Sequence, residues 1–597
     1  MIFKKSCLVL VGLVFTACGG GGGTGGTVNT SNLPTNSSIK VSLTKTSNKP
    51  VSKITHTVSS NPNKIHPKAI CGDVSKAEPK VTVSYAINQS VNTVNKVTSN
   101  DTSNKTTATI SGKITFDSIP FKTGGRLGLD YDAKIVKNVR GATVQIVNAS
   151  GTTVGTTTTD VNGDYSITVT EDEVKVRVLA QLYKAPSSGE SSWNFQIKDN
   201  TNGDALYVME GSLASLGTTG TQIRNLNAAS GWGGSSYTST RAAAPFSMLD
   251  VVYEAIEKVT SAQSDAVFGS LDVFWSKDNI ASSGNKNLGQ ITTSHFDGTA
   301  LYILGKENSD TDEYDTAVVA HEWGHYYEAK FSRSDSIGGS HGSADMLDIR
   351  VAFGEGFGTA FGCIIINSNL YLDSSGTRQE TTGVFSDVEA GGSRTNPGWY
   401  NEASIYSILY DIYDSDNDVG DTLSLGFTPM HQALIGAQKN TAAFTSIFSF
   451  IKVLKDENPS SAVAIDALTS NESIAPITDI YGTGRTNRAV NANPLYSTLT
   501  EGGSIGIVLD YSATATSTDN MLGRYNFVKF TISNPGTYTI DLSQIAGSAA
   551  LDPDMSLYKE GSTTAIAEIT NEGTTDTISV DLTAGNYRMA VIVYTSN

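Results

Sequence analysis

The stretch that decides the fold reads His321-Glu322-Trp323-Gly324-His325, an H-E-x-x-H pentad. Four apolar residues, 317–320, precede it, and Asp310 with Glu313 offers a helix start. Because residues four apart share one face of a helix, both imidazoles can reach a single ion. Two neutral histidines and one carboxylate suit zinc and leave a fourth position for water.

A second helical run, from Val351 to Ile366, is apolar except for one carboxylate, Glu355. Burying a lone carboxylate is costly, and a metal ion is its natural partner, with an ion pair to an arginine as the alternative. Glycines within this run would let another helix approach closely. We therefore predict His321, His325 and Glu355 as ligands of Zn²⁺.

The pentad followed by FGEGFGTAF (353–361) resembles the gluzincin class of bacterial secreted zinc metallopeptidases. That class takes its third metal ligand from a Glu on a second helix, which implies Glu355 here, and it implies Glu322 as the general base. Thermolysin-like members carry an Asp four residues after the ligand Glu, where this chain has Thr359. Support for a ligand histidine must then come from elsewhere, and Asp345 or Asp348 are the candidates. The metzincin pattern needs a third His, which HEWGHYYEAKF (321–331) lacks.

Peptide hydrolysis also needs a donor for the oxyanion that forms beside the metal. The resemblance implies a Tyr or a His from a later helix, and we favour Tyr400 in GWYNEASIYSILY (398–410), with Tyr406 and His431 as alternatives. His341, in a Gly-Ser loop, is interpreted as a residue without a catalytic role, the alternative being a group on the substrate side.

An acidic run follows residues 398–410, and carboxylate oxygens at alternate positions suit Ca²⁺. The alternative is a solvated loop. Its members are Asp414, Asp416, Asp418 and Asp421.

The N-terminus is interpreted as a lipoprotein signal peptide over residues 1–17. Two lysines precede an apolar run, 7–15, that is too short to span a bilayer, and Phe15-Thr16-Ala17-Cys18 resembles a bacterial lipobox. Cys18 would then be lipidated, and Gly19 after it is typical of an outer-membrane lipoprotein. An ordinary secretory signal is the alternative. Residues 18–55 are expected to form a flexible linker.

The rest of the chain divides into further segments. Residues 56–107 stay unassigned between linker and ordered structure. Residues 108–182 resemble the carboxypeptidase-regulatory β-sandwich through TDVNGDY (159–165), an Asn-Gly hairpin signal. Residues 183–240 are a connecting or pro-like region, and 241–492 the metallopeptidase domain.

Residues 500–597 resemble the pre-peptidase C-terminal β-sandwich through DPDMSLYKEG (552–561) and LTAGNYRMAVIVY (582–594). The expected fold is therefore multidomain, with a mainly α, zincin-like α+β catalytic domain between N-terminal and C-terminal β-sandwich domains.

Composition limits the partners. The chain has 597 residues, of which 17% are charged and 57 are Gly, as in β-rich extracellular modules. Residues 1–107 carry a net charge of +9 and the remainder −26, so the acidic body argues against nucleic acid. If Cys18 is lipidated, Cys71 and Cys363 are the cysteines left in the mature chain. Cys363 is expected to be a buried free thiol, and the alternative is a disulfide between Cys71 and Cys363.

The function expected is that of a lipid-anchored zinc endopeptidase acting on extracellular proteins or peptides. Two alternatives stay open: a surface adhesin with a non-peptidolytic metal site, and a zinc aminopeptidase. Residues 293–308 lack the Gly-Glu motif with which aminopeptidases of this class hold the substrate amine, which favours the endopeptidase.

Overall fold

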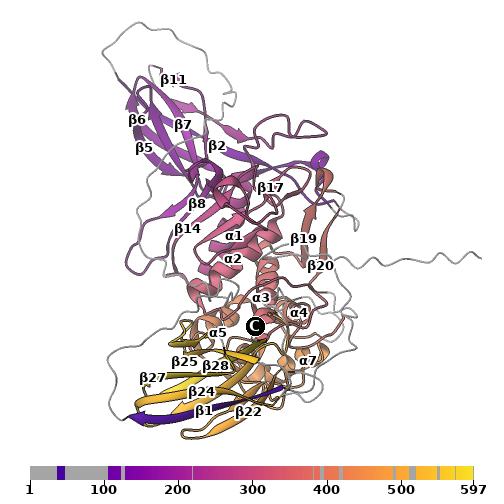
Figure 1. The fold of residues 1–597 in the computed structure, drawn as a ribbon. Helices are drawn as coiled ribbons and strands as arrows, with labels where there is room; N and C mark the ends of the chain where they lie inside the picture. Colours follow the sequence, from indigo (N-terminus) through magenta and orange to yellow (C-terminus); the bar gives the residue numbers. More distant parts are fainter. Residues whose placement is uncertain are drawn as a thin grey trace, which may run out of the picture.

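The computed structural model describes residues 37–47, 105–122, 128–217, 220–380, 382–389, 395–415, 421–487, 493–509, 519–546, 551–571 and 573–595. The predicted signal peptide, Cys18 and Cys71 lie outside these ranges. An N-terminal sandwich, a central helical region and a C-terminal sandwich follow one another along the molecule (Figure 1).

The main sheet extends from the N-terminal sandwich into the central region. Its order is β15 (His295–Phe296), β16 (Ala300–Ile303), β14 (Val267–Trp275), β8 (Ser192–Asp199), β7 (Glu173–Lys184), β4 (Ala142–Asn148) and β5 (Thr153–Thr158). Strands β8, β14 and β16 are parallel, whereas the edge strand β15 is antiparallel to β16. Three short strands pair beside this path: β9 (Ala205–Leu206), β10 (Val208–Glu210) and β11 (Ala214–Ser215).

This continuity corrects the expected domain borders. β7 pairs with β4 of the sandwich on one edge and with β8 on the other, so the sheet crosses residue 182 without a break. Region 183–240 is not a separate connector, because it supplies β8 to the sheet and its buried residues belong to the same hydrophobic core as the helices. The sequence hid this because β9–β11 are too short to show alternation.

A second sheet forms the other layer of the N-terminal sandwich. It consists of β12 (Thr221–Ile223), β2 (Thr106–Ser118), β13 (Leu226–Ala228), β3 (Ile135–Asn138) and β6 (Asp164–Glu171). The Asn-Gly turn predicted as a hairpin connects the two sheets instead, because β5 pairs with β4 and β6 pairs with β2. Asp160 Oδ1 accepts hydrogen bonds from the amides of Asn162 and Asp164, and Gly163 adopts φ 76°.

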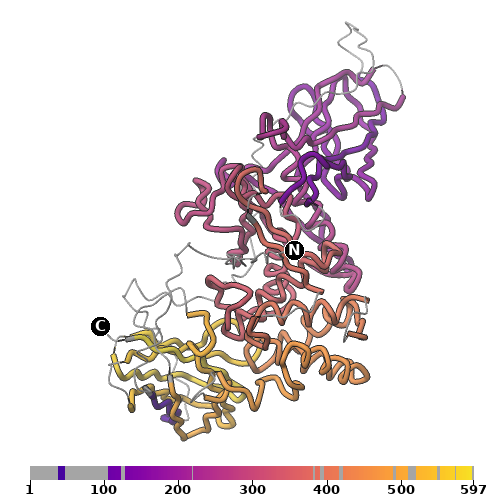
Figure 2. Tube along the Cα trace, turned by 90° about the vertical axis from the view of Figure 1, so that its right-hand side faces the viewer, coloured from indigo at the N-terminus to yellow at the C-terminus, as the bar shows by residue number. Residues whose placement is uncertain are grey.

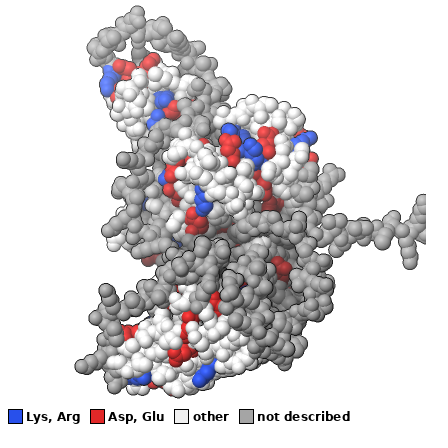
Figure 3. All heavy atoms as spheres, in the orientation of Figure 1, with Lys and Arg blue, Asp and Glu red and all other residues white. Residues whose placement is uncertain are grey.

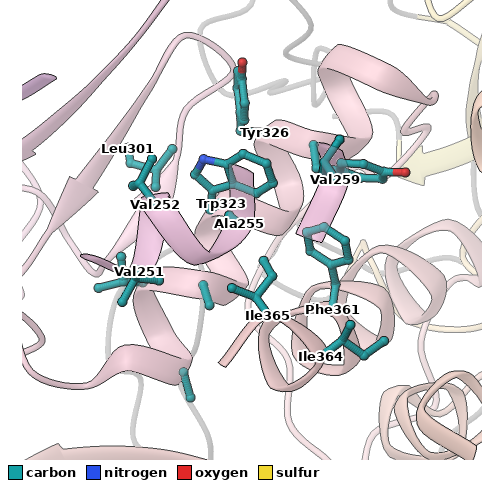
Figure 4. Close-up of a cluster of buried hydrophobic side chains, with 14 of the residues drawn as sticks. Val251, Val252, Ala255, Val259, Leu301, Trp323, Tyr326, Phe361, Ile364 and Ile365 are labelled. Carbon is teal, nitrogen blue, oxygen red and sulfur yellow. The ribbon is translucent and has the colours of Figure 1, made fainter. Parts of the chain in front are cut away.

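The helices are α1 (Ala244–Ala262), α2 (Thr316–Phe331), α3 (Ile349–Ile366), α4 (Glu402–Tyr413), α5 (Phe427–Ala433), α6 (Ile447–Glu457) and α7 (Ala462–Asn471). Figure 4 shows apolar side chains of α1, α2 and α3 meeting around Trp323, which is fully buried. A small sheet of β17 (Gly305–Lys306), β18 (Asp310–Thr311), β19 (Leu370–Ser375) and β20 (Thr382–Asp387) flanks α2 and α3.

The expectation of a mainly α catalytic domain is wrong. The described residues form 28 strands and seven α-helices, and strands β14–β20 lie inside the range assigned to that domain. The periodic helical runs dominated the sequence signal, whereas most of these strands have only two to four residues. A two-residue strand has no readable alternation.

The C-terminal sandwich contains a strand from the other end of the chain. One sheet is β22 (Ser504–Leu509), β1 (Ser37–Ser47), β24 (Gly536–Ala546) and β27 (Thr575–Leu582). The other is β21 (Tyr496–Thr498), β23 (Asn526–Ile532), β28 (Gly585–Thr595), β25 (Leu551–Lys559) and β26 (Ala567–Ile569). The indigo strand β1 lies among yellow strands in both views (Figures 1 and 2).

Residues 37–47 are therefore not linker, which corrects the assignment of 18–55 in its described part. β1 is a central strand, antiparallel to both β22 and β24, and Ile39, Val41 and Leu43 are fully buried. Ser, Thr and Lys alternate with these apolar residues, and this polar composition led to the prediction of a flexible linker.

One helix, α3, is long and apolar enough to cross a membrane, and 89% of its apolar window is buried inside the protein. On the face seen in Figure 3, side chains of both charges are interspersed among uncharged residues.

A pair of substitutions tests the position of β1. Val41→Asp places a charge in the C-terminal core, and we expect it to lower the free energy of unfolding of this sandwich by about 3 kcal/mol or more. Lys40→Asp, one residue away on the exposed face, is the matched control and should change it by less than about 1 kcal/mol. Thermal unfolding measures both, and equal small effects would contradict the central placement of β1.

Candidate metal centre

Helices α2 and α3 bring the three predicted ligands together. His321 Nε2 and His325 Nε2 lie 3.0 Å apart, and each lies 3.4 Å from Glu355 Oε2. A tetrahedral zinc site with bonds of about 2.1 Å has ligand-to-ligand distances of about 3.4 Å. Glu355 Oε2 is buried and has no hydrogen-bond partner in the described part of the chain. Donor types, separations and this unsatisfied oxygen all fit a zinc ion.

Missing side chains allow the two helices to approach closely. A Cβ on Gly324 would lie 3.4 Å from Gly358 Cα, and a Cβ on Gly358 would lie 2.9 Å from the His321 ring. A Cβ on Gly362 would lie 3.0 Å from the backbone nitrogen of His321. Gly358 thus provides the space in which the ligand ring rests.

Neighbouring side chains orient the ligand rings. His321 Nδ1 lies 3.2 Å from Thr359 Oγ1, and His325 Nδ1 lies 3.9 Å from Glu328 Oε2. Thr359 lies four residues after Glu355, where thermolysin-like enzymes carry Asp, and its hydroxyl contacts the His321 ring. Of the candidates from the sequence, Asp348 is used elsewhere, because it caps α3 and pairs with Arg350.

The structure adds a residue that the sequence reasoning set aside. His341 is 4% exposed, and its Nε2 lies 3.4 Å from Glu355 Oε2 without a hydrogen-bond partner. Its Nδ1 lies 2.6 Å from Glu402 Oε2 at the start of α4. His321, His325 and Glu355 form the set of mutually close donors, and His341 approaches from beside that set. A His between glycines and serines gave no sequence signal of this contact.

The C-terminal sandwich holds the loop that carries His341. Asn520 Nδ2 donates to the carbonyl of Ser340 at 2.8 Å, and the amide of Asp348 donates to the carbonyl of Asn520 at 2.7 Å. The amide of Leu522 donates to the carbonyl of Met346. Hydrogen bonds from segment 519–524 therefore hold the loop 340–348, which carries His341, in place beside the predicted metal ligands.

Charge in the site is predominantly negative. Burial alone would raise the pKa of Glu355, but His341 and His325 hold it well below its usual range. Burial alone would lower the pKa of His325, but Glu355 and Glu328 raise it well above its usual value. Burial opposes the same rise at His341, whose pKa Glu402 and Glu355 raise well above its usual value. A bound divalent cation would neutralise these carboxylates directly.

Glu322 faces the edge of the main sheet. Its Oε2 accepts a hydrogen bond of 2.9 Å from the amide of Phe296 in β15. The carboxylate is 2% exposed and is one residue from the first ligand. A carboxylate thus lies beside the predicted metal ligands and contacts an edge strand.

The predicted oxyanion donors are spread over different environments. Tyr400 packs against Trp399 with ring centroids 4.9 Å apart, and its role stays a prediction. Tyr406 is buried on α4. His431 lies behind α2, where its Nδ1 is 2.7 Å from Tyr327 Oη and its Nε2 is 3.1 Å from Gln263 Oε1, and burial lowers its pKa to about 4. Both nitrogens of His431 are thereby occupied.

The remaining predicted sites have mixed outcomes. Cys363 is a buried free thiol among the described residues, and the alternative of a disulfide cannot be followed there because Cys71 lies outside them. Of the acidic run, Asp416 and Asp418 lie outside the described residues, while Asp414 ends α4 and Asp421 accepts a hydrogen bond from the amide of Leu423. Calcium binding there stays a prediction, as does lipidation at Cys18.

Comparisons with known proteins add little to this geometry. No protein-family model and no curated protein matches the chain. The chain is similar to aminopeptidase A of Legionella pneumophila, solved in complex with aspartic acid, with a TM-score of 0.21 and 13% identity. The match covers 71% of this chain and only 38% of the aminopeptidase chain. A similarity this low carries no argument about fold or activity.

The glycine contact predicts one test of the site. Gly358→Ala would push a methyl group against the His321 ring, and we expect zinc affinity to fall about 10-fold or more because a ligand is displaced. Gly506→Ala in β22, whose Cβ would meet only Ile545 at 3.7 Å, is the control and should keep its zinc. Zinc titration against a chelator measures both. Unchanged affinity in Gly358→Ala would contradict the ligand role of His321.

Proposed function

We propose that the chain is a zinc-dependent peptidase. The observation that carries the proposal is the convergence of His321, His325 and Glu355 from two helices, with Glu322 beside them. A site that only stores or senses a metal does not need a carboxylate of this kind next to a ligand. The intact Glu322 therefore favours the peptidase over an adhesin.

Each residue of the site has a task in this proposal. His321, His325 and Glu355 would hold zinc, which when bound lowers the pKa of a water molecule and polarises the scissile carbonyl. Glu322 accepts a proton from the attacking water and delivers it to the leaving amide nitrogen. The hydrogen bond from the Phe296 amide orients its carboxylate for this transfer.

His341 is the donor that we propose for the oxyanion. Glu402 fixes its Nδ1, so its Nε2 is directed into the site, where Glu355 Oε2 lies 3.4 Å away. A carboxylate behind an imidazole orients the ring and favours its protonated form. Tyr400, by contrast, packs its ring against Trp399.

The edge strand β15 supports an extended peptide as substrate. Its backbone lies at the border of the main sheet, and its Phe296 contacts Glu322 directly. An extended segment can add to such an edge through main-chain hydrogen bonds other than that of the Phe296 amide, which donates to Glu322. This arrangement favours an endopeptidase over an aminopeptidase, because chain can continue on both sides of the scissile bond. With a lipidated Cys18, the substrates would be proteins outside the cell.

Glu322→Gln tests the proposed reaction. This isosteric change removes the base and keeps the ligands, so we expect cleavage of casein to fall at least 10³-fold with one zinc per chain retained. A folded wild-type chain that binds zinc and cleaves neither casein nor a peptide library would contradict the proposal. Elemental analysis and peptide-release assays supply both readouts.

His341→Gln and Glu402→Gln test the oxyanion donor. We expect kcat to fall about 10²-fold or more in His341→Gln, with KM and zinc content little changed, and by a smaller factor in Glu402→Gln. Tyr400→Phe serves as the comparison and should leave kcat within a few-fold. Loss of zinc in His341→Gln would instead identify His341 as a ligand, and a large loss of kcat in Tyr400→Phe would restore Tyr400 as the donor.

A further inference from the structure

Three aspartates meet where the small sheet borders the site helices. Asp310 lies on β18, Asp312 follows that strand, and Asp373 lies on β19. Each offers a carboxylate oxygen, and these oxygens all lie within 4.8 Å of one another. The sequence reasoning used Asp310 only as a helix start, because Asp373 is remote in sequence and joins the others only through the sheet.

Asp312 is buried with an unsatisfied oxygen. Its side chain is 3% exposed, and Oδ2 accepts a hydrogen bond from Ser294 Oγ. Among the described residues, its Oδ1 has no hydrogen-bond partner, and neither has Oδ1 of Asp310. A buried carboxylate oxygen without a partner is costly, so a further group is expected at this place.

No basic side chain compensates this charge among the described residues. The basic side chains of the region pair with other acids: Arg241 with Glu313 and Lys306 with Asp278. Burial, and then the neighbouring carboxylates, raises the pKa of Asp310, Asp312 and Asp373 well above the usual range. Three such groups cannot all stay ionised without protons or a cation.

We propose that Asp310, Asp312 and Asp373 form a second metal site, separate from the zinc ligands, that binds a hard divalent cation, with Ca²⁺ as the best match. All donors are oxygens, which hard cations prefer and zinc does not require. Oxygens on opposite sides of Ca²⁺, at about 2.4 Å from it, lie about 4.8 Å apart, which the cluster accommodates. Mg²⁺ demands a smaller and more regular shell.

The cation would fasten together the two segments that carry the zinc ligands. Asp312 lies four residues before α2 begins at Thr316, and β19 follows the end of α3. The same segments are already joined by Asp315, whose carboxylate accepts hydrogen bonds from the amide and the hydroxyl of Ser374. A metal beside this contact would stabilise the alignment of α2 with α3. The inference does not depend on the proposed peptidase activity.

The full zinc-loaded chain allows a direct test with Ca²⁺. We expect about 1 mM Ca²⁺ to raise the melting temperature by about 5 °C, with one additional ion per chain measured by calorimetric titration. Asp312→Asn should abolish both effects while zinc content stays unchanged. If Asp312→Asn does not fold, Asp373→Asn, which is less buried, takes its place.

Two matched variants locate the ion. Asp278→Asn changes an exposed carboxylate beside Lys277, and Asp554→Asn changes the separate group of Asp552, Asp554 and Asp576 in the C-terminal sandwich. Both should keep the full response to Ca²⁺. Persistence of the response in Asp312→Asn and Asp373→Asn, or its loss only in Asp554→Asn, would overturn the assignment.

A shared proton is the competing explanation, and the same measurements separate it. In that case Ca²⁺, Mg²⁺ and Mn²⁺ up to about 10 mM would leave the melting temperature unchanged, and Asp312→Asn would raise it at pH 7 by removing carboxylate repulsion. That result would also overturn the proposal. Zinc content and peptide cleavage would be unaffected by this outcome, so it is distinguishable from a failure of the zinc site.

Discussion

The close contact between α2 and α3 is the constraint on which the rest of the structure depends. The carboxylate of one helix meets two imidazoles of the other where the two backbones come close together. Gly324 and Gly358 permit that approach, and the aromatic residues around them fix its direction. Trp323 stacks on Phe361 with ring centroids 6.0 Å apart, so the same two helices that present ligands on one side share an aromatic core on the other. Polar function and apolar packing are thus two faces of one helix pair.

The three clustered residues of the candidate metal centre were readable in the sequence because their signals are local. His321 and His325 share a helix face through spacing alone, and Glu355 stood out as a single charge in an apolar run. His341 gave no such signal, because its contact with Glu355 depends on a loop path and on Glu402, 61 positions later. The buried aspartates near α2 were missed for the same reason. What pattern reasoning lacks is the pairing of strands that are far apart in the chain.

The same limit explains the errors in the fold. Long helices were found, whereas strands of two to four residues were not, and the sheet that unites the N-terminal sandwich with the site is built partly from such strands. The C-terminal sandwich was expected from its alternation, yet it also contributes Asn520 to the loop over the site. It is therefore part of the structural support of the centre and not merely attached to it.

Strand β1 has a consequence for how the chain assembles. Ser42 Oγ donates to the carboxylate of Asp541, 499 positions later, and the apolar face of β1 is covered only by strands from the end of the chain. β1 therefore cannot pair until β22 and β24 have been synthesised, although it precedes them in the chain by more than 450 residues. Contacts of such high sequence separation form slowly. The C-terminal sheet is complete only when these distant segments meet, so a chain that lacks β1 would leave both β22 and β24 with an open edge.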